Sequence, residues 1–123
     1  MISPRPPPST VIVVDDDDGL RRALRYALEI EGFNVVTCAS AESLLKLALP
    51  RTSACLVVDQ ALPGLSGIDA LEALRAQQMD LPAIVITSSP DARLRDRTQL
   101  ANAVLIEKPL LNDRLTRAIR ALL

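Results

Sequence analysis

The sequence predicts an α/β fold in which helices cover both faces of a parallel sheet. Short apolar runs rich in Val, Ile and Leu alternate five times with segments whose apolar residues follow helical spacing. Four of the runs end in polar residues, namely Asp15-Asp16, Asp59, Thr87-Ser88 and Glu107-Lys108. Buried parallel strands are continuous apolar runs, and their carboxyl ends lie along one edge of the sheet. We therefore expect these polar side chains to converge in one crevice.

The first half of the chain is expected to hold a leader, two strands and two helices. Residues 1–9 carry four prolines and should form a disordered leader outside the folded domain, 10–123. Strands are expected at 11–14 and 33–38. A helix capped by Asp18 should end at Glu31-Gly32. Another helix, capped by Ser40, should run through Leu49 until Pro50 breaks it.

The second half should add three strands and three helices. The strands are expected at 54–59, 83–86 and 103–106. Ser66-Gly67 should open a helix toward Gln77. Ser89-Pro90 resembles a cap with proline at the first helical position, followed by a helix to near Asn102. A last helix should span about 112–122, so that every strand is followed by a helix, as parallel pairing requires.

Composition excludes several classes of function. The 123 residues make one domain, and a net charge of −1 provides no basic surface for nucleic acid. The only aromatic residues are Tyr26 and Phe33, which argues against base stacking, and the absence of histidine excludes a phosphohistidine carrier or a His-based triad. Cys38 and Cys55 have no metal-ligand spacing and should be small buried hydrophobes. With no membrane span or signal peptide in the sequence, we expect a cytoplasmic protein.

The converging side chains suit phosphoryl transfer. That reaction needs an in-line nucleophile and positive charge on the transferring oxygens, and a carboxylate can serve as the nucleophile. Asp15, Asp16 and Asp59 offer the oxygen ligands that Mg²⁺ (or Mn²⁺) prefers. The Lys108 ammonium and the Thr87 hydroxyl can each meet a phosphoryl oxygen. The other two acids of the run, Asp17 and Asp18, are expected to be solvated or to cap the first helix.

Residues 10–122 resemble the receiver domain of bacterial two-component response regulators, most of all receivers of the nitrogen-fixation regulator type. Four motifs carry this resemblance, in order and each at a strand end: Val-Val-Asp15-Asp16, Val-Val-Asp59 with Leu-Pro63-Gly-Leu-Ser-Gly67, Ile-Val-Ile-Thr87-Ser88, and Ile-Glu-Lys108-Pro109. The resemblance implies a flavodoxin-like three-layer sandwich with strand order 2-1-3-4-5. It also implies a phosphorelay component that catalyses only its own phosphorylation and dephosphorylation.

The resemblance also implies roles for individual residues. Asp59 would be the phosphoacceptor, and the metal would be held by Asp16, Asp59 and the Ala61 carbonyl, with Asp15 holding a metal-bound water. Thr87 and Lys108 would then contact the phosphoryl group. The Lys108-Pro109 peptide corresponds to one that is commonly cis in the family, although the sequence does not show its isomer.

Three positions depart from the family pattern, all on the side that would signal onward. Leu105 stands where the family usually has Tyr or Phe, and Asn102 replaces a common glycine. The segment from Thr87 to Lys108 is about one residue shorter than in similar receivers. Because leucine is smaller than tyrosine and has no hydroxyl, we expect a shallow conformational switch of the surface formed by the fourth helix, fifth strand and fifth helix.

The expected partners are a histidine kinase or phosphotransfer protein and, on the switching surface, a second copy of the chain. The kinase would dock near the first helix, where Leu20, Arg21 and Leu24 offer a small mixed surface. The switching surface carries interleaved charges that suit a symmetric dimer but also suit plain solvation. Those charges are Arg93, Arg95, Arg97, Arg114, Arg117, Arg120, Asp91, Asp96 and Asp113.

Two other classes of function remain open. A haloacid-dehalogenase-like phosphatase would use a strand-one aspartate, but Gly19 stands where that family has Thr or Val, and the chain is short for it. A pseudo-receiver would bind partners without phosphorylation, but such domains typically lack one of the acids or the lysine that are all present here.

Overall fold

The computed structural model describes residues 8–111 and 113–123 and contains one five-stranded parallel sheet. The strands are β1 (Thr10–Val14), β2 (Asn34–Cys38), β3 (Ala54–Asp59), β4 (Ala83–Thr87) and β5 (Val104–Glu107). Their order in the sheet is β2-β1-β3-β4-β5, and every neighbouring pair is parallel. The expected doubly wound fold and strand order are therefore confirmed.

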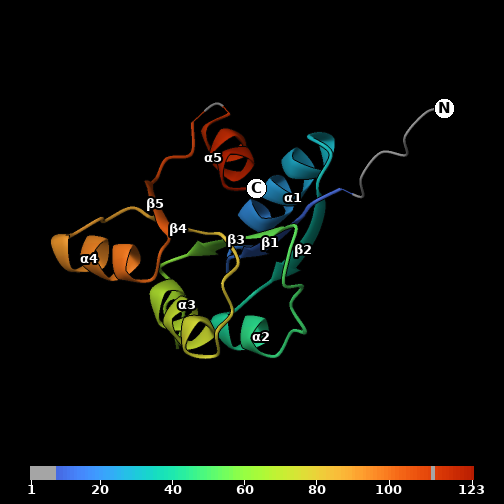
Figure 1. Ribbon diagram of the computed structural model, residues 1–123. Coiled ribbons are helices and arrows are strands. Elements are labelled where there is room, and N and C mark those ends of the chain that lie inside the picture. Colours follow the sequence, from blue (N-terminus) through green and yellow to red (C-terminus); the bar gives the residue numbers. More distant parts are fainter. Residues whose placement is uncertain (1–7, 112) are drawn as a thin grey trace.

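Helices cover both faces of the sheet and complete three layers (Figure 1). They are α1 (Asp18–Ile30), α2 (Ala41–Leu45), α3 (Gly67–Ala76), α4 (Ala92–Leu100) and α5 (Arg114–Leu122). In Figure 1, α1 and α5 lie on one face, whereas α2, α3 and α4 lie on the other. The sheet is therefore shielded from water on both faces, as its continuous apolar strands require.

The core consists of two aliphatic clusters separated by the sheet. One lies under α2, α3 and α4 and includes Leu56 and Leu71, whereas the other lies under α1 and α5 and includes Leu28 and Ile119. All six residues of β3 are buried. Phe33 is a buried aromatic residue, whereas Tyr26 is 70% exposed on α1. The central strand therefore delivers its last residue, Asp59, from the middle of the core to the sheet edge.

Both cysteines are buried free thiols, as the sequence predicts. Burial raises the pKa of the Cys55 thiol to about 12. Burial also raises the pKa of Cys38, although the nearby positive charge of Arg21 acts in the opposite direction. Neither thiol is therefore ionised near neutral pH, and the two side chains act as small core residues.

Helix α1 begins earlier than the sequence predicts, and helix α4 begins later. Asp17, not Asp18, caps α1, because its carboxylate accepts a hydrogen bond from Leu20 N at 3.0 Å. The prediction that Ser89-Pro90 caps the fourth helix is wrong. Helix α4 is capped by Asp91, whose carboxylate accepts a hydrogen bond from Leu94 N at 2.8 Å. Ser89 instead donates its backbone N–H to the Thr87 hydroxyl. In both helices an aspartate side chain accepts the hydrogen bond from a free N–H of the first turn, in place of the nearby residue that the sequence predicts as the cap.

Three other boundaries differ from the expectation. Ser40 does cap α2, but this helix ends at Leu45 rather than Leu49, since its last turn tightens into i→i−3 bonds such as that from Leu47 N to Leu44 O. The last helix begins at Arg114, and residue 112 lies outside the described residues. So do residues 1–7 of the expected leader, whereas the Ser9 carbonyl accepts from Asn34 N at 3.0 Å at the start of β2.

Asn102 adopts the left-handed backbone conformation, with φ of 55°. Asparagine tolerates this region better than other residues with a side chain, so it can take the place of the glycine that is common in similar receivers. The turn into β5 follows directly, since Ala103 N donates to Thr98 O at 3.0 Å. This departure from the family pattern therefore leaves the local fold intact.

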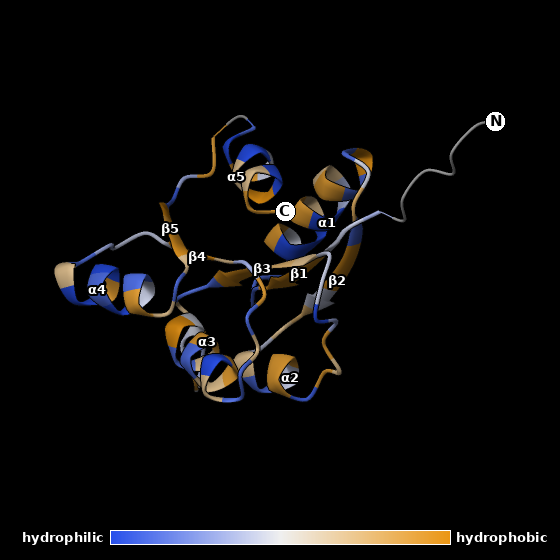
Figure 2. Ribbon diagram, in the orientation of Figure 1, coloured by the Kyte–Doolittle hydropathy of each residue, from blue (hydrophilic) through white to orange (hydrophobic). Residues whose placement is uncertain are grey.

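Helix α4 is attached to the domain through both apolar and polar contacts. Only Leu94 and Thr98 of this helix are buried, and Figure 2 shows α4 coloured largely blue. The Arg97 guanidinium forms ion pairs with Asp69, at 2.9 Å, and with Glu72, both on α3. These contacts lower the pKa of both carboxyl groups. Since an exposed ion pair typically contributes 1 kcal/mol or less, these pairs add only modestly to the attachment of α4.

Gly67, the first residue of α3, lies against the backbone of Asp59. A Cβ at this position would lie 2.5 Å from the Asp59 carbonyl oxygen and 3.0 Å from its carbonyl carbon. Real Cβ atoms do not approach so closely, so any other residue must push α3 away from the end of β3. The absence of a side chain at Gly67 thus sets the path of the loop that follows Asp59.

We predict that Gly67→Ala lowers the free energy of unfolding by about 1–3 kcal/mol, because overpacking outweighs the better helix propensity of alanine. The matched control is Gly19→Ala in α1, where the new Cβ would meet only the Asp17 carboxylate at 3.4 Å. That variant should be neutral or more stable. Urea unfolding of both variants provides the measurement, and equal stability of the two would contradict the steric argument.

Candidate functional site

The candidate site lies at the carboxyl edge of the sheet, where four strands end at the same level. In the strand register, Val14 pairs with Val58, Asp59 with Ile86, and Thr87 with Glu107. Asp15 and Asp16 follow β1 directly, and Lys108 follows β5. The register therefore brings together the acids, the hydroxyl and the lysine that the sequence places at strand ends.

Three carboxylates form the centre of the site. Asp15, Asp16 and Asp59 each offer an oxygen, and these oxygens all lie within 4.8 Å of one another. Asp15 and Asp59 are buried, with exposed fractions of 4% and 5%, whereas Asp16 is exposed at the mouth. Three negative charges at this separation repel one another strongly in a partly buried place, so the arrangement favours a bound cation.

Lys108 supplies the positive charge of the site. Its Nζ atom lies 2.8 Å from Asp59 Oδ1, and the two groups form an ion pair. Among the described residues, Asp59 Oδ1 is the only buried side-chain oxygen or nitrogen without a hydrogen-bond partner. Partial burial lowers the pKa of Lys108, but the ion pair with Asp59 and the charges of Asp15 and Asp16 outweigh this and raise it. Lys108 is therefore protonated at neutral pH.

The backbone holds Lys108 in this position. Lys108 N donates to the Thr87 carbonyl at 2.8 Å, which extends the pairing of β4 and β5 by one residue. The Lys108-Pro109 peptide is cis, as the resemblance implies. The side chain is 31% exposed, so its stem leaves the surface and its charge points inward to Asp59.

Asp15 is anchored at every polar group. Its N–H donates to Cys38 O at 3.1 Å, and its Oδ1 accepts from Asp17 N at 2.9 Å. Its carbonyl oxygen accepts from Nη1 of Arg21 at 2.7 Å. Burial raises the pKa of the Asp15 carboxyl, the hydrogen bond from Asp17 lowers it, and the charge of Asp59 raises it again, with a net upward shift.

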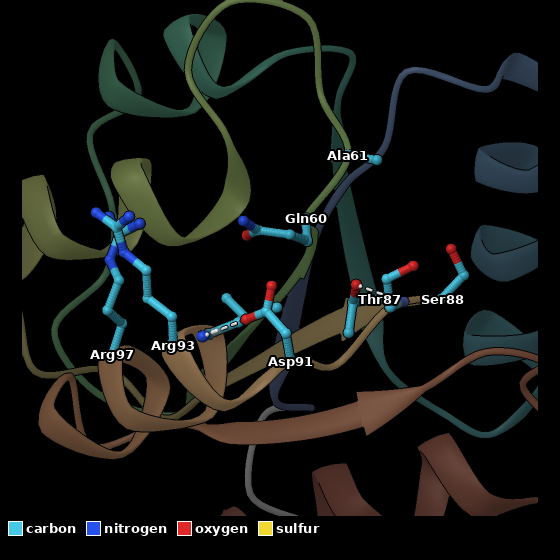
Figure 3. Close-up of a pocket in the computed structure, with 9 residues that line it drawn as sticks. Gln60, Ala61, Thr87, Ser88, Asp91, Arg93 and Arg97 are labelled. Atoms are coloured by element: carbon cyan, nitrogen blue, oxygen red, sulfur yellow. Dashed lines mark hydrogen bonds between the residues drawn. The ribbon is translucent and has the colours of Figure 1, made fainter.

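Thr87 borders a cavity of about 460 Å³ beside the acids. Its hydroxyl accepts the Ser89 N–H at 3.1 Å and is buried at the end of β4. Figure 3 shows Gln60 and Ala61 on the opposite wall, with Arg93 and Arg97 rising from α4. The Thr87 hydroxyl and the loop after Asp59 thus lie at one opening.

Leu105 lies outside this group of polar residues. It is half-buried and packs against the core cluster on the α4 side of the sheet. It also lines a separate cavity of about 320 Å³, together with Arg95, Thr98 and Asn102. The candidate switch position is therefore placed between β5 and α4 rather than in the acidic crevice.

The sequence analysis missed two side chains that shape the loop after Asp59. Gln60 Oε1 accepts from Ile68 N at 2.8 Å, which ties this loop to the start of α3. Glu42, on α2, accepts from Leu65 N at 3.0 Å, and this contact lowers the pKa of its carboxyl. The contact of Glu42 joins segments 23 residues apart, and that of Gln60 depends on the path of the loop, so no periodic sequence pattern could have indicated either.

The donor set fits a divalent cation with a preference for oxygen ligands. Mg²⁺ is usually held by one or two carboxylates and keeps several waters. Asp16, at the mouth, and Asp59 can supply those carboxylates, and Ala61 is exposed in the loop that follows Asp59. The chemistry of the residues present therefore agrees with such an ion.

A comparison with protein families identifies the family of this chain. The sequence model described as response regulator receiver domain matches residues 11–120. The chain belongs to this family. Receiver domains of two-component response regulators are signalling domains rather than enzymes in the usual sense, and they typically bind Mg²⁺ at an acidic site.

Curated relatives and solved structures agree with the assignment. The transcriptional regulatory protein FixJ of Bradyrhizobium diazoefficiens is 36% identical over 104 residues, which cover 83% of this chain and 50% of that protein. The structure of the response regulator StyR is 37% identical with a TM-score of 0.86, covering 94% of this chain and 59% of that one. The receiver domain therefore spans about half the length of these relatives.

A third comparison concerns a receiver-like protein in complex with ligands. The response regulator TrrA of Thermotoga maritima, in complex with Mg²⁺ and BeF, is 25% identical with a TM-score of 0.81, over 94% of this chain and 99% of that one.

Among the described residues of this receiver domain, none of the helices has the length and apolar character that a membrane span requires.

Proposed function

We propose that this receiver domain accepts a phosphoryl group on Asp59 from a histidine kinase or phosphotransfer protein, in a reaction that depends on Mg²⁺. The observation that carries the proposal is the state of Asp59. Its carboxylate is buried in a cluster of three acids, and the only charged partner of its Oδ1 atom among the described residues is Lys108 Nζ, at 2.8 Å. A buried nucleophile beside a fixed positive charge is the arrangement that phosphoryl transfer requires.

The proposed step forms one bond and breaks one. An Asp59 carboxylate oxygen attacks the phosphorus atom, and the bond from phosphorus to the donor nitrogen or oxygen breaks. The leaving group takes the electron pair and then a proton, while Asp59 becomes an acyl phosphate. Dephosphorylation is a separate step: a water oxygen bonds to phosphorus, and the bond from the Asp59 oxygen to phosphorus breaks. Asp59 keeps the electron pair as a free carboxylate, and the protons of the water pass to the inorganic phosphate and the solvent.

The neighbouring residues have separate proposed roles. Asp16, Asp59 and the Ala61 carbonyl would hold the cation directly, and Asp15 would hold one of its waters. When bound, the cation would offset the negative charge that the carboxylates and the phosphoryl oxygens bring together. Lys108 would move from Asp59 Oδ1 to a phosphoryl oxygen, and the Thr87 hydroxyl would donate to another.

We predict that the native protein, with Mg²⁺ and acetyl phosphate, gains the mass of one phosphoryl group and that Asp59→Asn gains none. The matched control is Asp96→Asn, which removes an exposed carboxylate from α4 and should leave labelling unchanged. Intact-mass spectrometry measures the stoichiometry, and chelation of Mg²⁺ should abolish the gain. Full labelling of Asp59→Asn would sink the assignment.

The same experiment separates the two alternative functions. A pseudo-receiver would fold normally and take no label under any condition. A haloacid-dehalogenase-like phosphatase would turn over a generic phosphate ester repeatedly and lose that turnover in Asp15→Asn. The burial of Asp59 next to Lys108 favours the phosphoacceptor function over these two alternatives. The phosphatase would have its nucleophile at Asp15, and a pseudo-receiver would need no lysine paired with Asp59.

The proposed kinase docking surface lies next to Lys108. A largely apolar opening of about 510 Å³ lies there, and it is lined by Lys108, Leu20, Ser88, Pro109 and Leu110. The proposed partner, a histidine kinase or phosphotransfer protein, would therefore cover apolar side chains while presenting its phosphohistidine to Asp59. A cytoplasmic location belongs to the same proposal, and cell fractionation checks it.

We predict that Leu20→Asp slows phosphoryl transfer from a phosphorylated kinase at least tenfold but leaves labelling by acetyl phosphate within twofold, because the small donor needs no docking surface. Leu100→Asp is the control, since Leu100 is 87% exposed at the far end of α4. Stopped reactions followed by mass spectrometry give both rates. Equal slowing with both donors would contradict the docking surface.

Leu105 is the proposed switch position, and we expect phosphorylation to shift the α4, β5 and α5 surface only weakly toward a dimer. A leucine has no hydroxyl to bond in either of two positions, so its two positions should differ little in energy. Glu72 and Asp69 hold α4 through Arg97, which adds a salt-sensitive restraint on the same helix.

We predict that beryllium fluoride with Mg²⁺ raises the dimer association constant of the native protein about 5–30-fold. Sedimentation equilibrium measures this change, and Leu105→Tyr should enlarge it because tyrosine can bond at the new position. A thousandfold increase in the native protein would show that Leu105 does not weaken the switch.

A further inference from the structure

Arg21, on the first turns of α1, contacts the loop that carries the acids. Its Nη1 atom donates to the Asp15 carbonyl oxygen at 2.7 Å, and its Nη2 atom pairs with the Asp18 carboxylate. The side chain is only 18% exposed, which is low for an arginine at the start of an amphipathic helix. The guanidinium is therefore part of the site wall and not a solvated surface group.

This contact determines the direction of one peptide group. The carbonyl of Asp15 and the N–H of Asp16 belong to the same planar unit, so holding the carbonyl also orients Asp16. The following residue is held as well, because Asp17 N donates to Asp15 Oδ1 and Arg21 N donates to Asp17 O at 2.9 Å. Asp16 thus sits between two anchored neighbours, with its own carboxylate free at the mouth of the site.

The other arginines of α1 have different surroundings. Arg25 pairs with Glu29 on the outer face, where its side chain is 52% exposed. Arg22 is exposed, and its side chain forms no hydrogen bond or ion pair with any residue that the structure describes. The inward position of Arg21 is therefore specific to its place on the helix and is not a general property of the basic residues in this segment.

We propose that Arg21 is a positioning residue for the cation site, acting through the Asp15–Asp16 peptide. This inference rests on the proposed binding of Mg²⁺ by Asp16 and Asp59. The guanidinium fork binds two oxygens at once in a fixed geometry, the Asp15 carbonyl and the Asp18 carboxylate, which a lysine ammonium does not reproduce. Arg21 contacts no expected ligand atom of the cation itself.

Charge and geometry predict opposite effects when Arg21 is replaced. Removing a positive charge from beside the loop that carries Asp15 and Asp16 should, by electrostatics alone, strengthen the binding of Mg²⁺. Removing the hydrogen bond that orients Asp16 should weaken it, because outer contacts that orient metal ligands typically change affinity 10–100-fold. The sign of the change in Kd therefore separates a positioning residue from a mere neighbouring charge.

The test is a calorimetric titration of the unphosphorylated protein with MgCl₂, with urea unfolding to establish that each variant is folded. Arg21→Gln and Arg21→Lys should both raise the Kd for Mg²⁺ by about tenfold or more. The matched control Arg22→Gln, one residue away and exposed, should stay within twofold of the native value. Arg21→Lys keeps the charge, so its loss of affinity reports on the fork alone.

The outcomes separate this inference from the proposed function. If the native protein binds Mg²⁺ but Arg21→Lys binds it equally well, or Arg21→Gln binds it more tightly, Arg21 acts only as a charge and the inference is overturned. If the native protein binds no Mg²⁺, the proposed cation site itself is wrong. A lower unfolding free energy with an unchanged Kd would assign Arg21 a purely structural role and would also overturn the inference.

Discussion

The ion pair between Asp59 and Lys108 is the interaction on which the rest of the site depends. Three carboxylates lie within 4.8 Å of one another at the sheet edge, and Lys108 is the cation that the described chain places among them. Removing one partner of a fully buried pair costs about 3–5 kcal/mol, and less here because the lysine side chain is 31% exposed. Lys108 thus offsets part of the negative charge that the three carboxylates bring together.

The position of this site was predictable because it follows from strand ends. A continuous apolar run that stops at a carboxylate places that carboxylate at the edge of a parallel sheet, and the structure has Asp59 and Thr87 at the ends of β3 and β4. The strand order and the family were also predictable, since four motifs occur in order at these ends. Boundaries of helices were less so, because Asp17 and Asp18, or Ser89 and Asp91, compete for the same cap within two residues.

Contacts between distant segments could not be predicted from one sequence. Glu42 on α2 binds the loop after β3, and Arg97 on α4 binds Asp69 and Glu72 on α3. Each contact depends on how two elements pack and leaves no periodic pattern. The same holds for Arg21, which shares its helix with other arginines yet is the one that reaches the Asp15 carbonyl. These polar contacts link the acidic loop and α4 to the rigid core, so they are where a change at Asp59 could reach the surface.

We propose that Asp59, the other two acids and Lys108 form one Mg²⁺-dependent phosphoryl site. A crystal structure of the protein grown with Mg²⁺ and beryllium fluoride tests it most directly. We expect the beryllium atom bonded to an Asp59 carboxylate oxygen, Lys108 Nζ moved from Asp59 Oδ1 to a fluorine, and the cation bound by Asp16 and Asp59. Density for the adduct at any other residue, or an unmoved Lys108 with a cation bound elsewhere, would contradict this description of the site.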